Sequence, residues 1–119
     1  MSEKIGWLPE PEEHNYPAAL LYLELLFPAA RAAEVVEKLK AAGVSTFKAK
    51  DIFRASGLSL LGVSNSHVDK DRQKIASGRK LSPILLVRAD TRVIIADGYH
   101  RMCAVYAVDE DALIPCKIV

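Results

Sequence analysis

The residues best suited to chemistry lie in one short run, Asp97-Gly98-Tyr99-His100-Arg101. A carboxylate can accept a proton or hold a metal ion through water, and an imidazole exchanges a proton near neutral pH. A guanidinium can bridge two oxygen atoms of one anion. Glycine has no Cβ, so a phosphate-sized group can approach the backbone closely at Gly98. This concentration of polar functions makes the run the candidate site.

Two elements must position this run. Apolar residues 93–95 predict a short strand, and residues 99 to about 108 predict a helix, so the chain turns sharply at Asp97-Gly98. The first N–H groups of a helix lack intrahelical partners, and together with the helix dipole they attract an anion. We therefore expect the backbone of this turn to hold a phosphate, with the imidazole and the guanidinium beside it.

A purely structural interpretation of the same run is also open. Asp97 could cap the helix by accepting its first N–H groups, and Gly98 could be required only for a positive φ. His100 and Arg101 could then be ordinary surface residues.

Length and composition predict one soluble domain. The chain has 119 residues, of which 50% are hydrophobic, which suits one folded core and excludes a disordered protein. Sixteen Lys and Arg against 15 Asp and Glu give a net charge of +1, which argues against a protein that coats nucleic acid. The two cysteines, Cys103 and Cys116, lack metal-binding spacing and are expected to be core thiols. We see no signal peptide or membrane-spanning run and expect a cytoplasmic protein.

The N-terminal part divides into an arm and an apolar segment. Residues 1–15 are polar and Pro-rich and are predicted to form a flexible arm, unless Trp7 and Leu8 attach it to the single domain expected over residues 16–119. Residues 16–27 predict a helix, with Pro17 at its first position, that is apolar on nearly every face. Such a helix either forms a homodimer interface or packs beneath the sheet.

Periodicity, caps and turn signals predict the other elements. These are helices over residues 29–42, 50–55 and 65–78, a buried loop or short strand over 58–63, strands over 83–87 and 92–96, and a final strand over 114–119. Ser66 is expected to cap the helix over 65–78, with Asp69 as its capping-box partner. Pro115 favours a sheet edge or the start of a strand.

Two further groups of polar residues have functional and structural interpretations. Lys48, Lys50 and Arg54 could reach a phosphate, or they could be surface cations. His67 is expected at the surface or near the helix cap, because no second ligand is spaced to join it in a metal site.

The segments PILLV, VIIADGYHR and IPCKIV, in this order and separated by a helix, resemble the ParB/sulfiredoxin superfamily over about half of the chain, from residue 65 to residue 119. The closest variant is Asp-Gly-x-His-Arg, found in ParB-like proteins that include free-serine kinases. The resemblance implies an α+β fold of the ParB/sulfiredoxin type, with a small mixed sheet, a strand-turn-helix anion site and N-terminal helices.

The resemblance also implies roles for individual residues. Gly98, His100 and Arg101 match positions that hold nucleotide phosphates in sulfiredoxin-like relatives, and Lys70 lies on the helix that supplies a phosphate-contacting lysine there. Asp97 matches the acidic residue of the kinase-like variant. Tyr99 stands where sulfiredoxin has its reactive cysteine, so sulfinic-acid reduction is not expected. No helix-turn-helix module follows the last strand in this sequence, so operator recognition is not expected either.

Three function hypotheses follow. The first is a nucleotide- or phosphate-binding domain, with phosphotransfer or NTP hydrolysis in which Asp97 and His100 are catalytic and Mg²⁺ accompanies the nucleotide. In it, Gly98, Tyr99, Arg101 and, less directly, Lys70 bind phosphate. The second is a non-catalytic module that associates with a second copy through residues 16–27. The third, a DNA-binding or nuclease domain, is disfavoured by the balanced charge and by the lack of an acidic cluster for metal ions.

Overall fold

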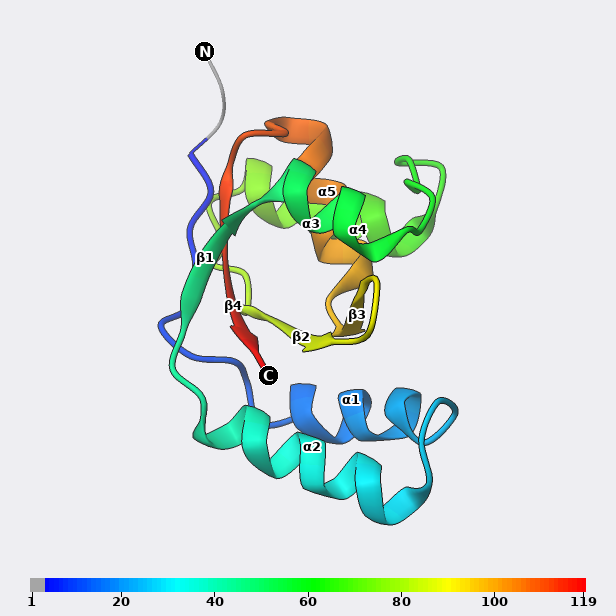
Figure 1. Cartoon of the computed structure of the whole chain (residues 1–119). Helices are drawn as coiled ribbons and strands as arrows, with labels where there is room; N and C mark the ends of the chain where they lie inside the picture. The colour runs from blue at the N-terminus through cyan, green and yellow to red at the C-terminus, as the bar shows by residue number, and fades with distance from the viewer. Residues whose placement is uncertain (1–3) are drawn as a thin grey trace.

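The computed structural model describes residues 4–119 and has the predicted α+β class (Figure 1). Its helices are α1 (Asn15–Leu23), α2 (Ala29–Ala41), α3 (Ala49–Ser56), α4 (Ser66–Ala76) and α5 (Tyr99–Val108). Its strands are β1 (Ser45–Lys48), β2 (Ile84–Arg88), β3 (Val93–Asp97) and β4 (Leu113–Ile118).

The described strands form one mixed sheet in the order β1-β4-β2-β3. β2 and β3 form an antiparallel hairpin, and β1 pairs antiparallel with β4. β2 and β4 are parallel, and the chain between them consists of β3 and α5. β3 therefore lies at one edge, and the turn into α5 begins at that edge.

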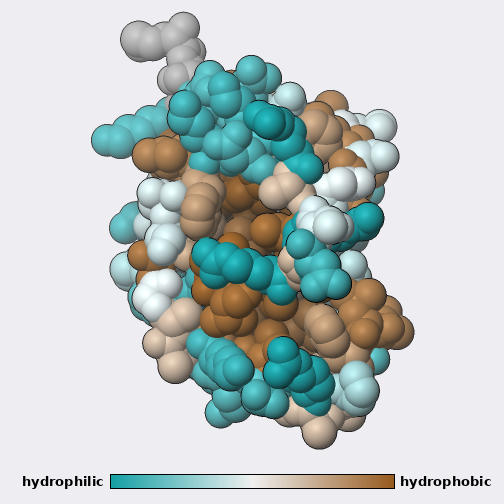
Figure 2. Space-filling view, in the orientation of Figure 1, coloured by the Kyte–Doolittle hydropathy of each residue, from teal (hydrophilic) through white to brown (hydrophobic). Residues whose placement is uncertain are grey.

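Helices cover both faces of the sheet (Figure 1). On one face α3, α4 and α5 share a core with Ile84 and Leu86 of β2, and on the other α1 and α2 pack with Leu85 and Val87. These residues alternate along β2, as the two-residue period of a strand requires, so β2 is buried on both faces. Apolar side chains remain visible between the two helical layers (Figure 2).

Two features of the sheet differ from expectation. β1 was not predicted, because its sequence STFK lies at the sheet edge and is mostly exposed, so it lacks an apolar alternation. The edge position expected from Pro115 is wrong, since β4 lies between β1 and β2. Pro115 is tolerated because the pairing with β2 begins only at the next residue, where Ile84 lies opposite Cys116.

α1 is shorter and less enclosed than predicted. It ends at Leu23, before a turn that leads to Pro28, and its buried apolar residues are Tyr16, Ala19 and Leu23. This face packs against the sheet, as one of the two alternatives proposed. Leu21, Leu25 and Leu26 are 69%, 82% and 49% exposed, so the opposite side is uncovered. Pro17 is the third helical residue rather than the first.

The segment before α1 is attached to the domain from Gly6 onward. The backbone N–H of Leu8 donates to the carbonyl of Leu81 at 2.8 Å, and Leu81 N–H donates to the carbonyl of Gly6 at 2.9 Å. The Ser82 hydroxyl donates to the Glu12 carboxylate. The attached alternative is therefore the one observed, and the first three residues of the predicted arm lie outside the described residues.

Two local predictions are corrected. Asn65, not Ser66, caps α4, because its side chain accepts from the N–H groups of His67 and Val68. The segment 58–63 is a largely exposed loop rather than a buried one.

The cations before and within α3 have acidic partners. Lys48 and Lys50 pair with Asp111, and Arg54 pairs with Asp51, so these cations are surface ion pairs. None of the helices in the described part of the chain is both long enough and apolar enough to span a bilayer.

Candidate functional site

Gly98 makes the turn from β3 into α5 possible. It is the N-cap of α5 with φ at +110°, a conformation that residues with a Cβ rarely adopt. A Cβ at this position would lie 2.3 Å from Ile84 Cγ2 and 2.9 Å from Arg101 Nη2. The groups that approach the backbone closely at Gly98 are therefore Ile84 and Arg101, and the expected approach of a phosphate stays a prediction.

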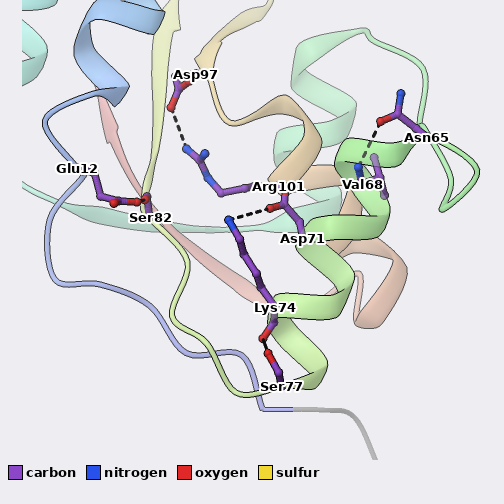
Figure 3. A network of polar contacts seen from close by, with 9 residues as sticks. All are labelled: Glu12, Asn65, Val68, Asp71, Lys74, Ser77, Ser82, Asp97 and Arg101. Carbon is purple, nitrogen blue, oxygen red and sulfur yellow. Dashed lines mark hydrogen bonds and ion pairs between the residues drawn. The ribbon is translucent and has the colours of Figure 1, made fainter.

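Arg101 and Asp97 form an ion pair across the turn (Figure 3). Arg101 Nη2 donates to Asp97 Oδ2 at 2.9 Å and to the carbonyl of Pro83 at 3.4 Å. Both side chains are more than four-fifths buried, at 16% and 17% exposure, and Arg101 Nε is buried without a hydrogen-bond partner. Asp97 thus engages Arg101 instead of capping α5, which decides against the capping interpretation.

The N-terminus of α5 faces a pocket whose opposite wall is α4. We call it the anion pocket, and its volume is about 240 Å³. The lining residues come from α4 and from the β3–α5 turn: His67, Lys70, Asp71, Lys74, Asp97, Gly98, His100 and Arg101. No side chain caps α5 at Gly98, so the first N–H groups of this helix are not taken up by a cap.

The α4 wall contains site residues that sequence analysis did not identify. His67, Asp71 and Lys74 line the anion pocket together with Lys70, which only the family resemblance had suggested. All four lie on one face, because their spacing of three, four and seven residues matches the helical repeat. That spacing was the available signal. It also fits a solvated charged face, so the spacing alone does not indicate a site.

The two pocket histidines lie against each other. The rings of His67 and His100 have centroids 4.9 Å apart and are inclined by 42°. Burial lowers the pKa of His100, and the nearby His67 and Arg101 lower it further, while Asp71 opposes them. These effects favour the neutral form of His100, and an anion beside the ring would favour its protonation.

Asp71 is the buried acid of the pocket. Its residue exposure is 9%, and its carboxylate lies 3.8 Å from Lys74 Nζ (Figure 3). Burial raises the pKa of Asp71, although Lys74, Arg101 and both pocket histidines lower it. A carboxyl with a raised pKa that faces a cationic pocket is a candidate proton acceptor.

Tyr99 is not among the residues that line the anion pocket. Its hydroxyl donates to the carbonyl of Ser59, and its ring faces a neighbouring cavity. The buried thiols Cys103 and Cys116 are unpaired, as predicted, and burial raises the pKa of both. Within residues 4–119, no group of three or more His, Cys, Asp or Glu side chains is arranged to hold a metal ion.

Comparisons of this chain with protein-family models, curated proteins and solved structures give no match.

Proposed function

We propose that this protein binds the phosphate of a nucleotide or of another phosphorylated small molecule in the anion pocket. The observation that carries the proposal is the placement of Lys70, Lys74 and Arg101 around the uncapped N-terminus of α5. Against these three cations the pocket holds two carboxylates, Asp71 and Asp97, so the charge of its lining favours an anion.

In this proposal the pocket residues make different kinds of contact with the phosphate. Backbone N–H groups of Tyr99 and His100 would donate to phosphate oxygens, as at other helix N-termini. Lys70 is exposed and has room to approach a ligand as a mobile point charge. Arg101 is fixed by Asp97, so it supplies a positioned charge rather than the two-oxygen fork expected from sequence.

Phosphotransfer or NTP hydrolysis is the reaction class that we propose for a bound nucleotide. Asp97 is occupied by Arg101, which favours a positioning role, whereas Asp71 faces the pocket with a raised pKa and can accept a proton from an attacking hydroxyl or water. His100 would donate a hydrogen bond to the developing charge. Mg²⁺ would enter with the nucleotide, bound by its phosphates and, through water, by a pocket carboxylate.

We also propose that the domain is of the ParB/sulfiredoxin type. Two features support this proposal: a mixed sheet in which parallel β2 and β4 are joined through β3 and α5, and a glycine turn at the edge of the pocket. Tyr99 cannot form a thiol-linked intermediate, so the proposed chemistry excludes sulfinic-acid reduction.

Isothermal titration calorimetry tests the binding proposal. We expect heat on titration with ATP, ADP or CTP in the presence of Mg²⁺ and with inorganic phosphate. Removing a charge about 4 Å from the ligand costs ~1 kcal/mol or more, so Lys70→Ala should weaken binding by about fivefold or more.

The matched control is Lys38→Ala, which removes a cation ion-paired with Glu34 on α2 and should leave the affinity unchanged. Absence of heat with every ligand, or equal affinity in Lys70→Ala and the unmodified protein, would contradict the proposal.

A second candidate function, homo-oligomerisation, is favoured by the exposed leucines Leu21, Leu25 and Leu26. Exposed leucines grouped on one turn are typical of interaction surfaces. We expect sedimentation to give the mass of a dimer, and Leu25→Glu to give that of a monomer. A monomer for the unmodified protein at high micromolar concentration would exclude this candidate.

A further inference from the structure

A second cavity adjoins the anion pocket. We call it the apolar cavity, and its volume is also about 240 Å³. Its walls come from four parts of the chain: Tyr22 of α1, Leu58 of the loop after α3, Ile95 of β3 and Tyr99 of α5. Apolar and aromatic groups thus enclose a space beside a cationic one, and an amphiphilic ligand would match both.

The two cavities are neighbours at the N-terminus of α5. Asp97, Gly98 and His100 line both of them. The His100 ring lies between the rings of His67 and Tyr99, with centroid separations of 4.9 Å and 5.5 Å. A row of three aromatic rings therefore runs from one cavity to the other, and a ligand with its phosphate at the helix terminus can place its organic part along this row.

Two polar side chains of the apolar cavity already have partners. Asp97 accepts from Arg101, and the Tyr99 hydroxyl donates to the carbonyl of Ser59. A nucleobase is recognised through hydrogen bonds to its edge, and with Asp97 and Tyr99 engaged elsewhere this leaves His100 and Tyr22 as the polar side chains of the cavity that could make one. What the cavity offers instead is aromatic and aliphatic surface at Tyr22, Leu58 and Ile95.

From this geometry we infer that the ligand is a phosphate ester of an aromatic group, whose ring occupies the apolar cavity while its phosphate occupies the anion pocket. The inference rests on the proposed phosphate binding and adds the chemical class of the organic part. An aromatic ring buries a large apolar area, so the ester should bind about tenfold or more tightly than a phosphate without a ring.

Calorimetry with four probes tests the inference: inorganic phosphate, methyl phosphate, naphthyl phosphate and AMP. We expect naphthyl phosphate to bind at least about tenfold more tightly than methyl phosphate and more tightly than AMP. Leu58→Ala should reduce the affinity for naphthyl phosphate several-fold and leave that for inorganic phosphate unchanged.

Leu60→Ala is the matched control. Leu58 and Leu60 lie in the same loop and are both 38% exposed, but Leu60 is not among the residues that line the apolar cavity. Because both side chains are partly exposed, both variants should fold, which an unchanged urea midpoint would verify. Leu60→Ala should keep the preference for the aromatic ester.

The outcomes separate the two proposals. If inorganic phosphate and all esters fail to bind, the proposed function itself is wrong. If phosphate binds but naphthyl phosphate gains nothing over methyl phosphate, only the present inference is overturned. It is also overturned if AMP binds more tightly than naphthyl phosphate, or if Leu58→Ala and Leu60→Ala have the same effect.

Discussion

Substituting Gly98 by alanine probes the turn that builds the site. A Cβ there would lie 2.3 Å from Ile84 Cγ2, 2.7 Å from Ile84 Cβ and 2.9 Å from Arg101 Nη2, on a backbone with φ at +110°. The positive φ costs about 1–2 kcal/mol in an alanine, and overpacking a filled interior costs about 1–3 kcal/mol more. We therefore expect Gly98→Ala to lower the free energy of unfolding by about 2–5 kcal/mol.

Gly78→Ala is the control, since Gly78 also has a positive φ, at +78°, but nothing lies within 4 Å of its added Cβ. Gly78→Ala should lower the free energy of unfolding only by the cost of the positive φ, about 1–2 kcal/mol. Urea unfolding of both variants measures the difference, which should be about 1–3 kcal/mol. Equal losses in the two variants would show that Ile84 and Arg101 do not crowd this turn, and the geometry of the site would then be wrong.

Three further predictions concern single side chains. The pKa of His100 is lowered chiefly by burial, so its protonation favours the unfolded chain. Stability should fall as the pH drops below the unfolded value of about 6.5, and urea midpoints should show a smaller fall in His100→Gln. Tyr99→Phe removes the hydrogen bond to the carbonyl of Ser59 and should cost about 1 kcal/mol in urea unfolding. Burial raises the pKa of Cys116 to about 12 and also raises that of Cys103, so a thiol reagent should label neither until urea unfolds the protein; rapid native labelling would contradict this.

The comparison of wild type with His100→Gln is needed because a second group titrates in the same pocket. Burial raises the pKa of Asp71, so its ionisation disfavours the folded state, and its contribution to stability is lost as the pH rises through the folded value. This dependence has the opposite sign to that of His100. Only the difference in the pH dependence of stability between the unmodified protein and His100→Gln isolates the contribution of the His100 imidazole.

Local signals predicted the strand-turn-helix unit well. A short apolar run followed by Asp-Gly and a helix-forming sequence has few alternative conformations. β3, the turn at Gly98 and α5 form as expected. Gly57 likewise ends α3 with a left-handed φ of +67°, as a helix stop should. These features depend on interactions within a few residues, which a sequence displays directly.

Features that depend on distant contacts were harder to predict. The face of α4 that carries His67, Lys70, Asp71 and Lys74 looks like a solvated surface until the fold places α5 opposite it. The Asp97–Arg101 pair was equally hard to predict, because it joins the end of β3 to the first turn of α5 and depends on the geometry of the turn between them.

The same limit applies to the sheet and to α1. The central position of β4 follows from its pairing with both β1 and β2, which a proline within the strand conceals. α1 ends at Leu23 although apolar residues continue to Phe27, and the turn that follows leads to Pro28, which disfavours a helical conformation at Phe27.

A crystal structure of the protein grown in phosphate tests the central claim most directly. The account predicts a phosphate in the anion pocket, with an oxygen about 2.9 Å from the backbone nitrogen of Tyr99 or His100 and with Lys70 turned toward it. A pocket without phosphate, with the ion bound only elsewhere on the molecule, would contradict it.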